Sequence, residues 1–195
     1  MKKSTLRSNL IKSIQESTKT IQNTIDIIPE IEQAIIAISN CISKGNKVVL
    51  FGNGGSAADA QHIAAELIGR FKLERQSYPS IALTTDTSCI TALSNDYSFD
   101  VIFSRQCESL VQKGDVVIGI STSGNSKNVL KGLRVVKKKG GITIGLLGSN
   151  GGLISKLVDI SIIVKSSSTA RIQEAHRTIY HMVCEEVEKI LSTGK

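Results

Sequence analysis

The sequence predicts an α/β fold in which a parallel sheet is covered by helices on both faces, and three observations support this. Five short apolar runs, KVVLFG, SIALTT, DVVIGIS, ITIGLLG and ISIIVK, read as strands that are buried on both sides. Amphipathic helical patterns alternate with these runs. The linkers are short, and 195 residues are enough for one domain with a sizeable core. We therefore expect a single domain over residues 1–195.

Two helices are predicted ahead of the first strand. Apolar residues recur at helical spacing in two stripes, Leu6, Leu10, Ile14 and Ile21, then Ile31, Ile35, Ile38 and Ile42. Pro29 precedes the second stripe and Gly45 follows it, as is typical of helix ends. Neither stripe has a place in the sheet sandwich. We therefore expect residues 1–45 to be oligomerisation helices that bury their stripes against partner subunits, ahead of an α/β core over residues 46–195.

Further helices are expected between the strands. Their periodicity places them at about 57–68, 87–93, 99–111 and 126–139, with a short helix near Leu153 and a long last helix at about 169–191.

Two of the predicted strands end in loops of small polar residues that lead straight into a helix. These loops are Gly52-Asn53-Gly54-Gly55-Ser56 and Ser121-Thr122-Ser123-Gly124-Asn125-Ser126. Ligands of open α/β sheets bind outside the carboxyl ends of the strands, and a helix N-terminus attracts phosphate. Ser56 and Ser126 as ordinary N-caps would explain either loop alone. The second loop holds more hydroxyls than one cap needs, which favours a phosphorylated small molecule.

A dinucleotide site is a rival interpretation of the first loop. The pattern Gly52-x-Gly54-x-x-Ala57 after a strand matches the glycine fingerprint of such sites. The acidic residue after the next strand, Asp86, follows about thirty residues later instead of about twenty, which speaks against it.

Ionisable residues gather on two of the predicted helices. His62 and Glu66 are four residues apart and share a helix face, where they could bind a metal, move a proton or form an exposed pair. The last helix carries Gln173, His176 and His181, and His176 is equally well explained as a satisfied core residue. Gln173 and His181 lie roughly 12 Å apart along the helix axis. A site that uses both therefore needs groups from another helix or another subunit.

Composition and charge exclude several classes of protein. Apolar residues make up 41% and charged residues 21% of the chain, as in ordinary globular proteins. The net charge of +7 is scattered and no nucleic-acid-binding module is present, so we expect no nucleic-acid partner. No apolar run is long enough for a membrane span and the N-terminus lacks a signal-peptide pattern, so we expect a cytoplasmic protein. The four cysteines form no C-x-x-C pair and are expected to be reduced and mostly buried.

The motifs together resemble one known family. They are, in order, the loop at 52–56, then Asp59, His62 and Glu66, then Asn95-Asp96 in a predicted loop, the loop at 121–126, and Arg171-Ile172-Gln173-Glu174 with His181. This order resembles the phosphoheptose isomerases of the sugar isomerase (SIS) domain superfamily over nearly the whole chain. The resemblance implies a flavodoxin-like three-layer sandwich with a five-stranded parallel sheet. It also implies a homotetramer with active sites at subunit interfaces.

The same resemblance implies the reaction and its residues. Sedoheptulose 7-phosphate would become D-glycero-D-manno-heptose 7-phosphate through an enediol, for bacterial surface polysaccharide. One zinc ion per subunit would be bound by His62, Glu66, Gln173 and His181. Glu66 would act as the base, and His181 would exchange protons with the sugar oxygens. The sugar phosphate would contact Asn53, Gly54, Gly55, Ser56, Glu66, Asn95, Asp96, Ser121, Thr122, Ser123, Ser126 and Gln173.

One position departs from part of the family, and two other functions stay open. Ala170 stands where some members carry an acidic residue, which concerns a contact to the sugar hydroxyls and not the activity. A non-catalytic SIS protein, such as a sugar-phosphate sensor or a partner of the replication initiator, is the first alternative. Retention of His62, Glu66, Gln173 and His181 argues against it. An isomerase acting on a pentose or hexose phosphate is the second.

Overall fold

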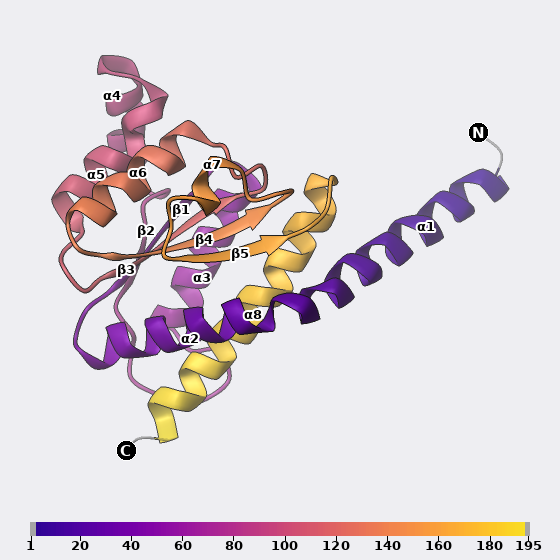
Figure 1. The fold of residues 1–195 in the computed structure, drawn as a ribbon, viewed down its shortest axis with the longest axis horizontal. Helices are drawn as coiled ribbons and strands as arrows, with labels where there is room; N and C mark the ends of the chain where they lie inside the picture. Colours follow the sequence, from indigo (N-terminus) through magenta and orange to yellow (C-terminus); the bar gives the residue numbers. More distant parts are fainter. Residues whose placement is uncertain (1–2, 194–195) are drawn as a thin grey trace.

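The sheet has the predicted parallel α/β architecture (Figure 1), in a computed structural model that describes residues 3–193. The strands are β1 (Val48–Gly52), β2 (Ser80–Ala82), β3 (Val116–Ser121), β4 (Ile142–Gly148) and β5 (Ile160–Val164). All neighbouring strands are parallel, and their order, β2-β1-β3-β4-β5, is that of flavodoxin-like folds. The predicted fold class is confirmed. The register pairs Val48 with both Ser80 and Val116, so β1 and β3 end side by side.

Helices form a layer on each face of the sheet. The α-helices are α1 (Lys3–Gln22), α2 (Ile28–Ser43), α3 (Gly55–Ile68), α4 (Thr87–Asp96), α5 (Ile102–Leu110), α6 (Lys127–Lys138), α7 (Gly152–Ser155) and α8 (Thr169–Thr193). Two 3₁₀ turns, η1 (Asn23–Ile27) and η2 (Phe99–Val101), precede α2 and α5. Helices α2, α3 and α8 pack on one face, and α5, α6 and α7 pack on the other.

Both helical layers follow from the side-chain alternation of the central strands. Successive side chains of a strand point to opposite faces, so Val48 and Leu50 of β1 join the core beneath α2, α3 and α8. Val49 and Phe51 join the core beneath α5 and α6, where the Phe51 ring stacks on Phe103. Every residue of β1 and β3 is buried. This explains why the strands are apolar throughout instead of alternating with polar residues.

The two N-terminal helices behave differently from each other. The α2 stripe is buried in the core of its own chain, so the expectation that it packs against a partner subunit is wrong. Helix α1 extends away from the sandwich and its second half lies along α8 (Figure 1), where Arg171 donates hydrogen bonds to Ser13. The first part of its stripe is open to solvent in the single chain, with Leu10 59% and Ile14 67% exposed, whereas Ile21 packs against the core.

One local prediction about the helices is wrong, and one alternative interpretation of the polar loops is not supported. Asn95 and Asp96 form the last turn of α4 and not a loop after it. Neither Ser56 nor Ser126 caps a helix with its side chain. Gly54, which has φ +54°, is the N-cap residue of α3, and the N-cap position of α6, at Ser126, makes no side-chain capping hydrogen bond. Within residues 3–193, no helix has the length and apolarity that crossing a bilayer requires.

Candidate active site

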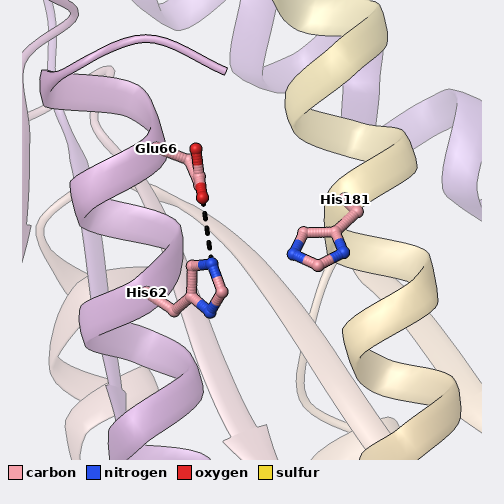
Figure 2. A group of neighbouring side chains, drawn as sticks. All are labelled: His62, Glu66 and His181. Carbon is pink, nitrogen blue, oxygen red and sulfur yellow. Dashed lines mark hydrogen bonds and ion pairs between the residues drawn. The ribbon is translucent and has the colours of Figure 1, made fainter. Parts of the chain in front are cut away.

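Helices α3 and α8 bring three metal-binding side chains together (Figure 2). His62 and Glu66 come from α3, His181 comes from α8, and one potential ligand atom of each lies within 4.8 Å of the other two. His62 Nε2 is 2.9 Å from Glu66 Oε1, and the His62 and His181 ring centres are 5.2 Å apart. All three side chains are partly open to solvent. His181 therefore meets its two neighbours from α3 within one chain.

The chemistry of this cluster suits a zinc ion. Partial burial lowers the pKa of His181, and His62 and Arg177 lower it further, while Glu66 opposes them. A lowered pKa keeps the imidazole neutral near pH 7, with a lone pair free for a metal or a proton. Two imidazole nitrogens and one carboxylate oxygen are ordinary zinc ligands, and three protein ligands leave a coordination position for substrate.

A polar network surrounds the other side of His62. The Tyr180 hydroxyl lies 3.1 Å from His62 Nδ1 and 3.4 Å from Asp59 Oδ1, and Arg177 Nε donates to it over 3.1 Å. Arg177 Nη2 also donates to Asp59 Oδ1 over 3.3 Å. Sequence reasoning singled out Asp59 without a role and missed Tyr180 and Arg177. Tyr180 directly precedes His181 on α8, and Arg177 lies one turn before it; this spacing was the available signal.

The two polar loops meet at the carboxyl ends of β1 and β3. Asn53 and Asn128 exchange a pair of amide hydrogen bonds of 2.9 and 2.8 Å, which join the first loop to α6. In the second loop, Ser121 and Ser126 share a hydrogen bond of 2.9 Å. The N–H groups of Ser56 and Ala57 bond to the carbonyls of residues 53 and 54, and Val129 N–H bonds to Asn128 Oδ1. Within residues 3–193, the remaining first-turn N–H groups, at 55, 127 and 128, have no hydrogen-bond acceptor and can meet a ligand such as phosphate. Asn128 is a structural residue of this site that the sequence interpretation overlooked.

Gln173 lies against the first loop. Its amide packs directly on Gly55, so that a side chain at position 55 would overlap it. Gln173 precedes His181 by eight residues, or roughly 12 Å along α8. Helix α8 thus contributes one side chain to the loop end of the site and another to the cluster.

Three other candidate residues lie apart from this site. Asn95 donates to Asp96 over 2.9 Å on the exposed end of α4, in the other helical layer. Within residues 3–193, no hydrogen bond or ion pair joins these two to the loops or the cluster. His176 is fully buried, its Nε2 lies 2.9 Å from the Leu147 carbonyl, and burial lowers its pKa. It is a core residue.

Known proteins resemble this chain in both sequence and fold. Residues 10–148 match the family model of the SIS domain. The phosphoheptose isomerase of Geotalea daltonii is 51% identical over 183 residues, 93% of this chain and 95% of that protein. The one from Geobacter sulfurreducens is 57% identical over 154 residues, 79% of this chain and 82% of that protein. The solved phosphoheptose isomerase from Neisseria gonorrhoeae superposes with a TM-score of 0.90 at 38% identity, covering 94% of this chain and 99% of that one.

Proposed function

The chain belongs to the SIS domain family and, within it, to the phosphoheptose isomerases, and we propose that its site interconverts sedoheptulose 7-phosphate and D-glycero-D-manno-heptose 7-phosphate. One observation carries the assignment of the site. Helix α3 begins at the phosphate-type loop and carries His62 and Glu66 on the turns that follow. From Ser56 to His62 the axial rise is roughly 9 Å, comparable with the length of an extended sugar phosphate. The phosphate end and the reacting end of the substrate thus each have a fitting partner.

Glu66 is the base in this proposal. Ketose–aldose isomerisation moves a proton between neighbouring carbons through an enediol, and a carboxylate can remove it from one carbon and return it to the other. His181, kept neutral by its lowered pKa, exchanges a proton with the sugar oxygens. The two side chains approach from facing helices, so both can reach one substrate carbon–oxygen pair.

His62, Glu66 and His181 would hold a zinc ion. When bound, zinc supplies polarisation of the sugar carbonyl and stabilisation of the enediolate charge. Gln173 stays a prediction as a fourth ligand. Its contact with Gly55 supports the substrate-binding role that was also predicted for it.

The phosphate group would bind between the two polar loops. Its proposed partners are the exposed hydroxyl of Ser123, the neighbouring Thr122, and the N–H groups at the first residue of α3 and the first two residues of α6. Asn53, Gly54, Gly55, Ser56, Ser121 and Ser126 shape the same loops. The pairing of Asn53 with Asn128 supports this arrangement because it holds the loops in fixed relation before substrate arrives.

We further infer a homotetramer whose sites are completed between subunits. The exposed stripe of α1 supports assembly. Asn95 and Asp96 make no hydrogen bond to the loops or the cluster within residues 3–193, which supports a role for them in the site of a neighbouring chain. All four cysteines are unpaired, which supports a reducing compartment such as the cytoplasm.

Turnover of purified protein tests the proposal directly. Protein loaded with zinc should convert sedoheptulose 7-phosphate, lose activity on treatment with a chelator, and regain it when zinc is restored. The same preparation should act much more slowly on a pentose 5-phosphate, which is shorter by two carbons. Absence of turnover by the zinc-loaded protein would refute the proposed reaction.

A further inference from the structure

The second imidazole nitrogen of His62 contacts a hydrogen-bond network, built on the buried side chains of Tyr180 and Asp59, that the proposed reaction does not use. Nε2 lies beside Glu66, whereas Nδ1 lies 3.1 Å from the Tyr180 hydroxyl (Figure 2 shows the two nitrogens on opposite sides of the ring). Tyr180 is only 2% exposed, and its ring packs edge-on against both His62 and His181. The hydroxyl is therefore held in place next to Nδ1.

The Tyr180 hydroxyl has two further partners, one hydrogen-bond donor and one acceptor. Arg177 Nε donates to it over 3.1 Å, and Asp59 Oδ1, 3.4 Å away, can accept its proton. The Asp59 carboxylate is 1% exposed, and its Oδ2 has no hydrogen-bond partner in the described part of the chain. Such a carboxylate is a strong acceptor with unused capacity.

A count of protons shows what this network does for His62. A neutral imidazole carries one proton. When Nε2 binds a cation, that proton is on Nδ1 and needs an acceptor. The Tyr180 oxygen accepts that hydrogen bond, and the Tyr180 O–H in turn donates a hydrogen bond to Asp59 Oδ1. When Nε2 carries the proton and donates to Glu66, the Tyr180 O–H turns to Nδ1 instead. Rotation of the Tyr180 hydroxyl thus gives Nδ1 a hydrogen-bond partner in both tautomers of the neutral His62 imidazole.

We propose that Tyr180, held by Asp59 and Arg177, is a positioning residue that orients His62 and stabilises the tautomer in which Nε2 is free to bind a cation. The inference rests on the proposed function only in taking zinc as that cation. Metal-binding histidines commonly donate their other N–H to an oxygen acceptor, and loss of such an acceptor weakens metal binding. Here the acceptor is a tyrosine backed by a buried carboxylate.

Tyr180→Phe tests the inference because it removes the hydroxyl and keeps the ring contacts. The zinc dissociation constant, measured by competition with a chelator, should rise about 10- to 100-fold. Tyr78→Phe is the matched control, since Tyr78 is also 2% exposed and stacks on Arg75, and within residues 3–193 its hydroxyl makes no hydrogen bond to His62, Glu66 or His181. The metal-free forms of both variants should melt at similar temperatures. Equal zinc affinities in the two variants would overturn the inference.

A second measurement separates this inference from the proposed metal site. His62→Ala reports whether zinc binds at the cluster, and an unchanged zinc affinity in that variant would refute the metal site itself. The Tyr180 contact is then read in metal-free protein from the ¹⁵N chemical shifts of the His62 imidazole, with ¹⁵N-labelled histidine. A shift of Nδ1 in Tyr180→Phe and not in Tyr78→Phe supports the inference. An unchanged Nδ1 shift in Tyr180→Phe contradicts it.

Discussion

Glu66 provides the sharpest test at the scale of a single residue. Glu66→Gln keeps the size of the side chain but removes its basicity, so kcat should fall by about 10²- to 10⁴-fold while the fold is retained. Circular dichroism and thermal melting of the same preparation check the fold. Glu74→Gln, a change at an almost fully exposed carboxylate on the loop after α3, is the control and should leave kcat unchanged. Activity of Glu66→Gln within tenfold of wild type would exclude Glu66 as the base.

Ser123 tests the position of the phosphate. Its exposed hydroxyl lies on the loop between β3 and α6, accepts a hydrogen bond from Asn125 N–H and lies 3.5 Å from Ser121 Oγ. Rotation of this hydroxyl can direct its proton to a ligand. Losing a hydrogen bond to a charged group costs roughly 1.5–3 kcal/mol, so Ser123→Ala should raise KM about 10- to 100-fold. Ser77→Ala, at an exposed position remote from the loops, should not change KM. An unaltered KM in Ser123→Ala would place the phosphate elsewhere.

The sequence revealed some of these residues more readily than others. His62 and Glu66 were predictable because one helix face displays both, and the polar loops were predictable because they follow buried strands. Tyr180 and Arg177 were not, because a tyrosine and an arginine on an amphipathic helix are equally compatible with ordinary packing. Only the pairing of α3 with α8 brings them to His62 and Asp59.

At the scale of elements, a buried ion pair joins the end of α3 to α8. The Glu188 carboxylate accepts the backbone N–H groups of Phe71, Lys72 and Leu73 at 2.7–2.9 Å and Arg75 Nε at 3.0 Å. Arg75 donates in turn to the carbonyls that end α3, including that of Glu66 at 2.8 Å. The two side chains are 1% and 5% exposed. This contact fixes the two helices on which the cluster is built.

Glu188→Gln should therefore destabilise the protein. Leaving Arg75 buried without its charge partner costs roughly 3–5 kcal/mol of unfolding free energy, which urea denaturation would measure. Glu186→Gln, at a half-exposed carboxylate on the same helix, should change it by less than about 0.5 kcal/mol. A loss below about 1 kcal/mol for Glu188→Gln would contradict the role assigned to the pair.

The same carboxylate predicts how stability depends on pH. Burial alone would raise the pKa of Glu188, but the N–H groups of residues 71–73 and Arg75 outweigh it, and the pKa is lowered. Because the pKa of Glu188 is lower in the folded state, its contribution to the free energy of unfolding is complete above the unfolded pKa of about 4.3. That contribution is lost as the pH falls through the folded pKa. Wild type should thus lose more unfolding free energy than Glu188→Gln between neutral pH and acid. Parallel pH profiles would contradict this.

Element boundaries were predicted less well than element types. The strands and helices were recognisable from their periodicity, whereas the end of α4 was not, because Asn95 and Asp96 resemble loop residues. The fate of the two N-terminal stripes also depends on tertiary structure. Both have helical spacing, but only α2 has a sheet face to cover, and α1 extends beyond it.

At the scale of the whole molecule, the exposed stripe of α1 predicts assembly. Four large apolar side chains, Leu6, Leu10, Ile11 and Ile14, are 46–67% exposed along one helix, which is unfavourable in water. Leu10→Ser combined with Ile14→Ser should shift the mass measured by light scattering from a tetramer to a smaller species. Lys19→Ser, a polar change on the same helix, should leave the mass unchanged. A tetramer that survives the double substitution would assign assembly to another surface.

Mixing two inactive variants tests whether each site needs two chains. Glu66 and His181 form their cluster within one chain, so variants at these two residues should not complement each other. Asp96 lies apart from its own chain's cluster. If it serves a neighbouring chain, the intact Asp96 of a Glu66→Gln chain would complete the site that contains the intact Glu66 of an Asp96→Ala chain. In mixed oligomers at equal amounts, a site has both residues only when the chain that supplies Glu66 is Asp96→Ala and the chain that supplies Asp96 is Glu66→Gln. Each condition is met half of the time, so about a quarter of the sites would be complete. Two inactive variants whose subunit exchange recovers no activity would instead assign Asp96 to the site of its own chain, and an active Asp96→Ala protein would assign it to no site.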